Sequence, residues 1–93
     1  MRVFAVQIDL HIHGSQSLKD KRRVIRGLIE SLKSKYNVSV VEIDYLDKWQ
    51  RALIGIAWIS HDGRGAESYL SEILSVVDNR DGVERIGTER FDY

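Results

Sequence analysis

The stretch that decides the fold is SLKDKRRVIRGLIESLKSKY, residues 17–36, which has the pattern of a capped amphipathic helix. Ser17 and Asp20 fit the S-x-x-[DE] pattern, in which a hydroxyl and a carboxylate satisfy amide donors of the first helical turn. At 100° per residue the apolar side chains fall on one stripe, which a hydrophobic core would cover. The stripe consists of Leu18, Ile25, Leu28, Ile29, Leu32 and Tyr36. We therefore predict a helix over residues 17–36 that stops at Asn37.

The same helix carries a basic ridge, roughly a right angle away from its apolar stripe. The ridge consists of Lys19, Arg22, Arg23, Arg26 and Lys33. Residues 17–36 contain seven of the chain's fourteen Lys and Arg residues but only two acids, although the whole chain has a formal net charge of zero. Such a local excess indicates an anionic partner, and RNA is the first candidate. The alternative is an ordinary solvated helix face, in which Glu30 pairs with Arg26 or Lys33.

The segments on either side of this helix predict strands and a second helix. Residues 3–12 alternate strictly between an apolar and a mixed face, which predicts a strand with one buried face. Residues 38–45 and 49–60 predict two more strands joined by residues 46–48, with a possible bulge at Val40-Val41. A helix is expected over roughly 64–79. Residues 83–91 are short of apolar side chains and predict an edge strand.

This order of elements, βαββαβ, defines the predicted fold. It is typical of the ferredoxin-like α+β sandwich, in which a four-stranded antiparallel sheet carries two helices on one face. The right-handed crossovers of that fold place the first and third strands in the centre of the sheet. We expect residues 1–93 to form a single domain.

Composition excludes several classes of protein. The chain has no cysteine, so disulfides, cysteine nucleophiles and thiolate-bound metals are excluded. No apolar run approaches the roughly 20 residues that a membrane-spanning helix needs. The N-terminal segment lacks the architecture of a signal peptide, because Asp9 interrupts a short apolar stretch. We therefore expect a cytoplasmic protein.

The segment DLHIH, residues 9–13, has the pattern of a metal-binding strand. Asp9, His11 and His13 project from the same side, and an H-x-H pair can chelate a metal ion. A site needs at least three ligands with a supporting second shell, however, and the only other histidine is His61. If this strand is central, Asp9 and His11 simply line the uncovered face of the sheet. We therefore expect neither a metal site nor a cofactor. Because no serine lies in a nucleophile motif and the carboxylates are scattered, we predict that the chain is not an enzyme.

The third predicted strand supplies candidate contacts of two kinds. Trp49 and Arg51 could stack on a base or anchor a partner, or Trp49 could close one end of the core. The run LIGIAWIS is apolar on both faces. If Ile54, Ile56 and Trp58 point away from the helices, they form an apolar patch suited to a homodimer interface, although Trp58 could also lie in the core.

The segments SLKDKRRVIRGLIESLKSKYNVSVVEID and WQRALIGIAWIS carry a family resemblance. The most specific parts are S-L-K-D-K-R, residues 17–22, and W-Q-R, residues 49–51. They resemble the YlxP-like family of small bacterial proteins of unknown function. The resemblance implies a ferredoxin-like fold. It also implies an association with translation, because members often look gene-linked to translation and ribosome-maturation factors, and this favours RNA.

These observations lead to one leading hypothesis and two alternatives. The leading one is a non-enzymatic binding module that contacts RNA or the ribosome through the basic ridge, with Trp49 and Arg51 as secondary contacts. The first alternative is an assembly module that forms a homodimer through the uncovered sheet face. The second is a metal site or small enzyme built on Asp9, His11 and His61.

Overall fold

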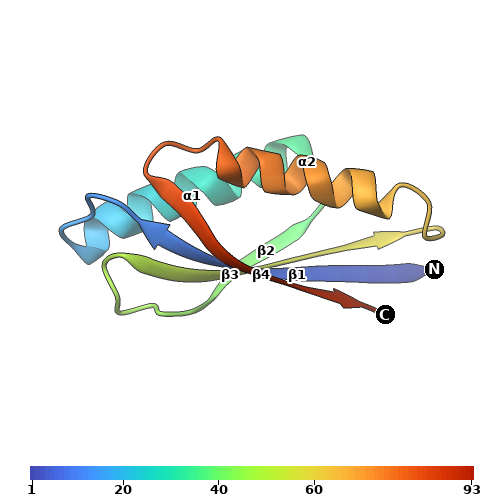
Figure 1. The fold of residues 1–93 in the computed structure, drawn as a ribbon, viewed down its shortest axis with the longest axis horizontal. Helices are drawn as coiled ribbons and strands as arrows, with labels where there is room; N and C mark the ends of the chain where they lie inside the picture. Colours follow the sequence, from blue (N-terminus) through green and yellow to red (C-terminus); the bar gives the residue numbers. More distant parts are fainter.

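The computed structural model describes residues 1–93 and has six regular elements (Figure 1). They are β1 (Arg2–Ile12), α1 (Leu18–Lys35), β2 (Ser39–Asp44), β3 (Arg51–Ser60), α2 (Ala66–Asp78) and β4 (Val83–Asp92). This order confirms the predicted βαββαβ arrangement. Each predicted element is present, and its ends differ from the prediction by two residues at most.

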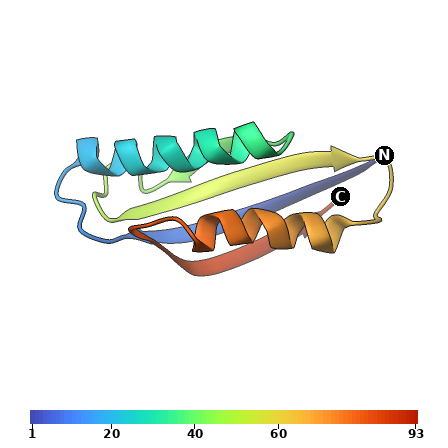
Figure 2. The same cartoon turned by 90° about the horizontal axis from the view of Figure 1, so that it is seen from above.

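The four strands form one antiparallel sheet in the order β2-β3-β1-β4. The first and third strands are therefore central and β4 is an edge strand, as predicted. Both helices cover the same face of the sheet and lie side by side on it (Figures 1 and 2). The fold is thus the ferredoxin-like α+β sandwich, and it leaves one sheet face, called the open face below, without a covering layer.

The core lies between this sheet and the two helices. It contains sixteen buried residues, including Ile25, Leu28 and Leu32 of α1, which belong to the predicted apolar stripe. The even-numbered side chains of β1 from Phe4 to Ile12 are all at most 2% exposed. Neither α1 nor α2 combines the length and the apolar character that a helix spanning a membrane requires.

The placement of Ile54, Ile56 and Trp58 on the open face is wrong. These residues are Cα partners of Ile8, Val6 and Phe4 on β1. Cross-strand partners share a face of the sheet, so all three point into the core, where their exposure is 1%, 1% and 7%. The prediction failed because β3 is apolar on both faces, and its own sequence does not say which face the helices cover.

Two irregularities interrupt the sheet at its edge strands. In β2 the register shifts between Glu42 and Asp44, so the bulge lies at Ile43 and not at Val40-Val41 as predicted. Val40 packs against the core and Val41 is exposed, so the alternation continues through this pair. In β4 the register shifts opposite Asp9 and Leu10. Such bulges re-aim the side chains that follow them.

Candidate functional site

The basic ridge is exposed along the outer side of α1. Lys19, Arg22, Arg23, Arg26 and Lys33 are all exposed. No ion pair in the structure includes a ridge residue or Glu30, so the pairing of Glu30 with Arg26 or Lys33 that the alternative interpretation allowed does not form. The ridge therefore presents five exposed cations that have no ion-pair partner.

The other sides of α1 pack against α2 and the sheet, and this determines which way the ridge faces. Gly27 lies against the Arg80 guanidinium at the end of α2, and Ser31 and Lys35 line a groove between the helices. The apolar stripe faces the sheet. At 100° per residue the ridge occupies the remaining arc, which points outward and away from α2.

One cation of the motif S-L-K-D-K-R is buried and does not belong to the ridge. Lys21 is 0% exposed, and its ammonium donates hydrogen bonds to Glu42 Oε2 at 2.8 Å, the Tyr45 carbonyl at 2.7 Å and the Arg51 carbonyl at 3.2 Å. It therefore ties α1 to β2, to the start of β3 and to the connection between them. The sequence held a signal for this position, because Lys21 precedes Ile25 by four residues and Leu28 by seven. That spacing places it on the apolar stripe.

Arg51 is held within the open face. Its Nη2 lies 2.9 Å from both carboxylate oxygens of Asp9, and its guanidinium carbon lies 4.6 Å from the centre of the Tyr45 ring. The hydrogen bond to Asp9 is the main cause that raises the pKa of Arg51 above its ordinary value, against the opposing effect of desolvation. Arg51 is thus paired within the protein. Trp49, which was predicted as a contact together with Arg51, is 54% exposed.

The two motifs that carry the family resemblance meet at one end of the molecule. Gln50 donates its side-chain amide to the Ser15 carbonyl at 3.0 Å, and its own carbonyl accepts from the Ile12 amide at 2.9 Å. Ser17 caps α1 by accepting from the Asp20 amide at 3.0 Å. Together with Lys21, these contacts join the start of α1 to the start of β3.

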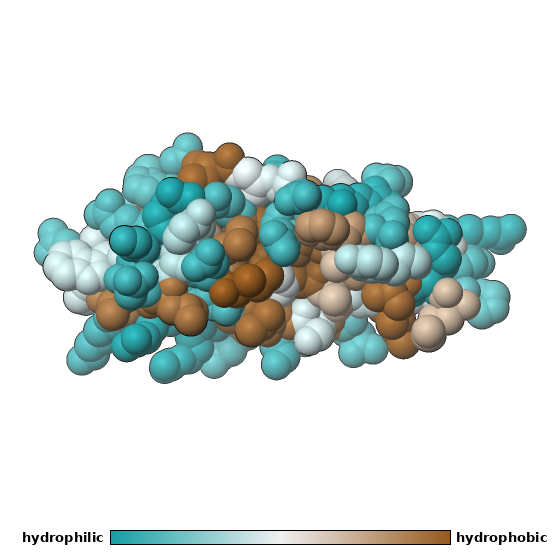
Figure 3. All heavy atoms as spheres, turned by 90° about the horizontal axis from the view of Figure 1, so that it is seen from below, coloured by the Kyte–Doolittle hydropathy of each residue, from teal (hydrophilic) through white to brown (hydrophobic).

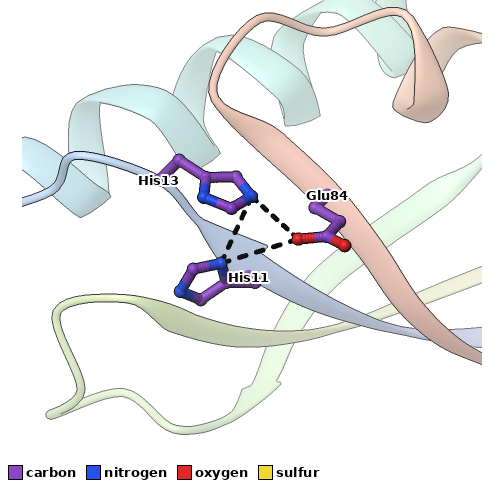
Figure 4. A group of neighbouring side chains, drawn as sticks. All are labelled: His11, His13 and Glu84. Atoms are coloured by element: carbon purple, nitrogen blue, oxygen red, sulfur yellow. Dashed lines mark hydrogen bonds and ion pairs between the residues drawn. The ribbon is translucent and has the colours of Figure 1, made fainter.

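A cluster of imidazoles and a carboxylate lies at the same end of β1 (Figure 4). His11 on β1, His13 in the following turn and Glu84 on β4 point toward one another. His13 Nε2 lies 2.8 Å from Glu84 Oε1 and 3.3 Å from His11 Nδ1, and His11 Nδ1 lies 3.8 Å from Glu84 Oε1. The expected partners of these histidines are elsewhere. Asp9 is paired with Arg51, and His61 follows Ser60, whose partner Arg2 is at the opposite end of β1.

Glu84 was not recognised from the sequence. Its place opposite His11 follows from the pairing of β1 with β4, which shifts register at the β4 bulge. Counting along the strands without that bulge misplaces every residue beyond it, so no sequence pattern marked Glu84 as the neighbour of the histidines.

The open face has its own apolar surface, formed by residues that differ from the predicted set. Figure 3 shows hydrophobic side chains across the middle of this face with polar groups around them. A shallow hollow of about 270 Å³ lies there and includes Val41, Ile43, Phe91 and Tyr93 in its lining. Val41 is 59% exposed, and Ile59, at 67%, adds to the apolar surface of β3.

The fold and these surfaces define a small ferredoxin-like domain with a cationic outer helix and an uncovered, partly apolar sheet. Residues 3–90 match the family described as "Protein of unknown function (DUF503)". The chain is also 38% identical over 74 residues, 80% of each chain, to "Uncharacterized protein YlxP" of Bacillus subtilis (strain 168). The chain therefore belongs to the DUF503 family, which confirms the YlxP-like resemblance.

Proposed function

We propose that this protein is a non-enzymatic binding module that contacts RNA or a ribonucleoprotein, such as the ribosome, through the basic ridge of α1. The observation that supports the proposal is that all five ridge cations are exposed and none forms an ion pair. In a chain of zero net charge, this concentrates the positive potential on one surface.

The dimensions of the ridge suit a nucleic-acid backbone. From Lys19 to Lys33 it extends about 21 Å along the helix, at about 1.5 Å per residue. Such a row meets several consecutive phosphates, and contacts of this kind position a strand without reading its sequence. Trp49 would add a stacking surface, because an exposed indole stacks on bases of any identity.

The number of ridge cations sets the expected salt dependence. If all five neutralise phosphates, the slope of log K against log salt concentration is about −3.5 to −4.5. Between 50 and 200 mM salt the affinity for RNA should then fall by about 100- to 500-fold. Fluorescence anisotropy with a labelled structured RNA measures this slope directly.

Charge reversal tests whether the ridge is the contact surface. We expect Lys19/Arg22/Arg26→Glu to abolish RNA binding. The matched control is Lys35/Lys48/Arg64→Glu, which changes the net charge by the same amount at exposed positions outside the ridge. Equal affinity of the ridge variant and the wild type would refute the proposal. Equal losses in the two variants would show that only overall charge matters, and would also refute it.

The apolar open face supports a second candidate function, assembly into a homodimer. A second copy of the chain presents the same apolar surface, so a two-fold arrangement would cover both surfaces at once. The contact residues would be Val41, Ile43, Ile59, Phe91 and Tyr93, in place of those predicted from the sequence. Sedimentation of the full chain over a range of concentrations tests this, and a monomer at the highest concentration would contradict it.

A further inference from the structure

The cluster of His11, His13 and Glu84 has the chemistry and spacing of a metal site. We propose that these three side chains bind a divalent transition-metal ion, with zinc the best-fitting ion. The ligand atoms are His11 Nδ1, His13 Nε2 and Glu84 Oε1. This proposal is independent of RNA binding and of dimer formation, because it uses none of the residues assigned to either surface.

The distances between the donor atoms match those around a tetrahedral ion. With zinc–ligand bonds of about 2.0–2.2 Å, two ligands of a tetrahedral ion lie about 3.3–3.6 Å apart. The three separations in the cluster are 2.8, 3.3 and 3.8 Å, so they bracket this value. Small side-chain rotations suffice to bring all three atoms to bonding distance of one ion.

The backbone holds all three donors on the same side of the sheet. His11 and Glu84 are Cα partners on the antiparallel strands β1 and β4, so their side chains are neighbours. His13 follows two residues later, and its amide donates to the Gly82 carbonyl at 2.8 Å, which fixes the turn. Gly82 has a φ of 78°, a left-handed conformation that favours glycine and lets the chain enter β4 opposite this turn.

The nearby arginines leave the Glu84 carboxylate free to bind a cation. Two arginines flank the cluster, since Arg51 is the Cα partner of His11 and Arg85 follows Glu84. Each is paired away from the cluster, Arg51 with Asp9 and Arg85 with Asp78, all at 2.9 Å. The carboxylate of Glu84 is therefore not neutralised by a neighbouring guanidinium and remains available to a metal ion.

The donor set determines the kind of ion and the kind of site. Two imidazoles and one carboxylate favour zinc and other late transition metals over magnesium or calcium, which prefer oxygen ligands alone. The side chains of His11, His13 and Glu84 are 32%, 55% and 56% exposed. Three protein ligands at the surface leave at least one position for water or for an anionic group of a partner.

Isothermal titration calorimetry of the untagged full chain with zinc tests the proposal, with magnesium as the comparison ion. A histidine tag would itself bind zinc, so it must be removed. We expect one zinc ion per chain, and more than about tenfold weaker binding in His13→Gln and in Glu84→Gln. The matched control is His61→Gln, because the side chain of His61 is 98% exposed and lies at the opposite end of β1. This variant should bind zinc like the wild type.

Cobalt provides a second measurement that reports on geometry. A tetrahedral cobalt complex of the wild type should give strong visible absorption bands that are absent in His13→Gln. Because all three positions are at the surface, circular dichroism should show the same fold in every variant. The proposal is overturned if the wild type does not bind zinc, or if His13→Gln and Glu84→Gln bind it as tightly as His61→Gln.

Discussion

Replacement of Lys21 by methionine should destabilise this protein strongly although it removes only one charge. Methionine keeps most of the aliphatic stem, so the loss of apolar packing is small. What disappears is the ammonium, which donates to Glu42 and to the carbonyls of Tyr45 and Arg51. All three acceptors lose their donor at once.

The magnitude follows from the burial of the pair. Removal of one partner of a buried ion pair costs about 3–5 kcal/mol, because the other charge is left without compensation. The side chain of Glu42 is 16% exposed, so water can partly replace the ammonium. We therefore use the lower end of this range of about 3–5 kcal/mol. We expect a loss of about 3 kcal/mol from a total stability of about 5–15 kcal/mol. For a domain of this size, that lowers the melting temperature by about 12–24 °C.

Lys19 offers a matched control two residues away on the same helix. Its side chain is exposed and forms no ion pair, so Lys19→Met should change the stability by less than about 0.5 kcal/mol. Urea denaturation followed by circular dichroism measures both variants under the same conditions. A loss below about 1 kcal/mol in Lys21→Met, or equal losses in the two variants, would refute the assigned role of Lys21.

A second substitution separates the effect of the unpaired Glu42 charge from the effect of the two carbonyls that have lost their donor. Glu42→Gln in the Lys21→Met background removes the uncompensated carboxylate charge while the two carbonyls remain without a donor. We expect the double variant to be more stable than Lys21→Met alone. If it is less stable, the carboxylate has found other partners and the pair does not account for the loss.

Two further predictions concern the cap of α1 and the open face. Ser17→Ala should lower the free energy of unfolding by about 1 kcal/mol, because the Asp20 amide loses its acceptor. The control Ser68→Ala, at an exposed position of α2, should lower it by less than about 0.5 kcal/mol. Urea denaturation measures both variants, and equal effects would contradict the capping role of Ser17. Val41→Lys should shift a homodimer toward monomer in sedimentation experiments, whereas Leu46→Lys, at an exposed apolar residue in the β2–β3 connection, should not. Unchanged association in Val41→Lys would place the interface elsewhere.

The sequence predicted every helix and strand, but it predicted which side chains are buried only where the apolar residues lie on one face. α1 has one apolar stripe, so the burial of Leu28 and Leu32 followed from helical phase alone. β3 is apolar on both faces, and only its pairing with β1 decides that Ile56 points into the core. Lys21 has the helical position of a buried residue, but its acceptors come from β2, β3 and their connection, which helical spacing does not reveal.

The same physical limit explains why the candidate sites were only partly predicted. The basic ridge depends on one helix, so its residues could be named from their spacing. The cluster of His11, His13 and Glu84 joins residues about seventy positions apart through a strand pairing that contains a bulge. Local periodicity carries no information about such a pairing. Glu84, which takes the place next to the histidines that Asp9 was considered for, could therefore be found only in three dimensions.

The two motifs that carry the family resemblance contain both structural residues and cations of the basic ridge. In S-L-K-D-K-R, Ser17 caps the helix and Lys21 is buried, whereas Lys19 and Arg22 are exposed. In W-Q-R, Gln50 and Arg51 hold one end of the fold together. Ser17, Lys21, Gln50 and Arg51 stabilise the fold, and their contacts carry no argument about RNA. Only the exposed cations carry the functional argument, and the paired tests of Lys21 and of the ridge measure the two roles separately.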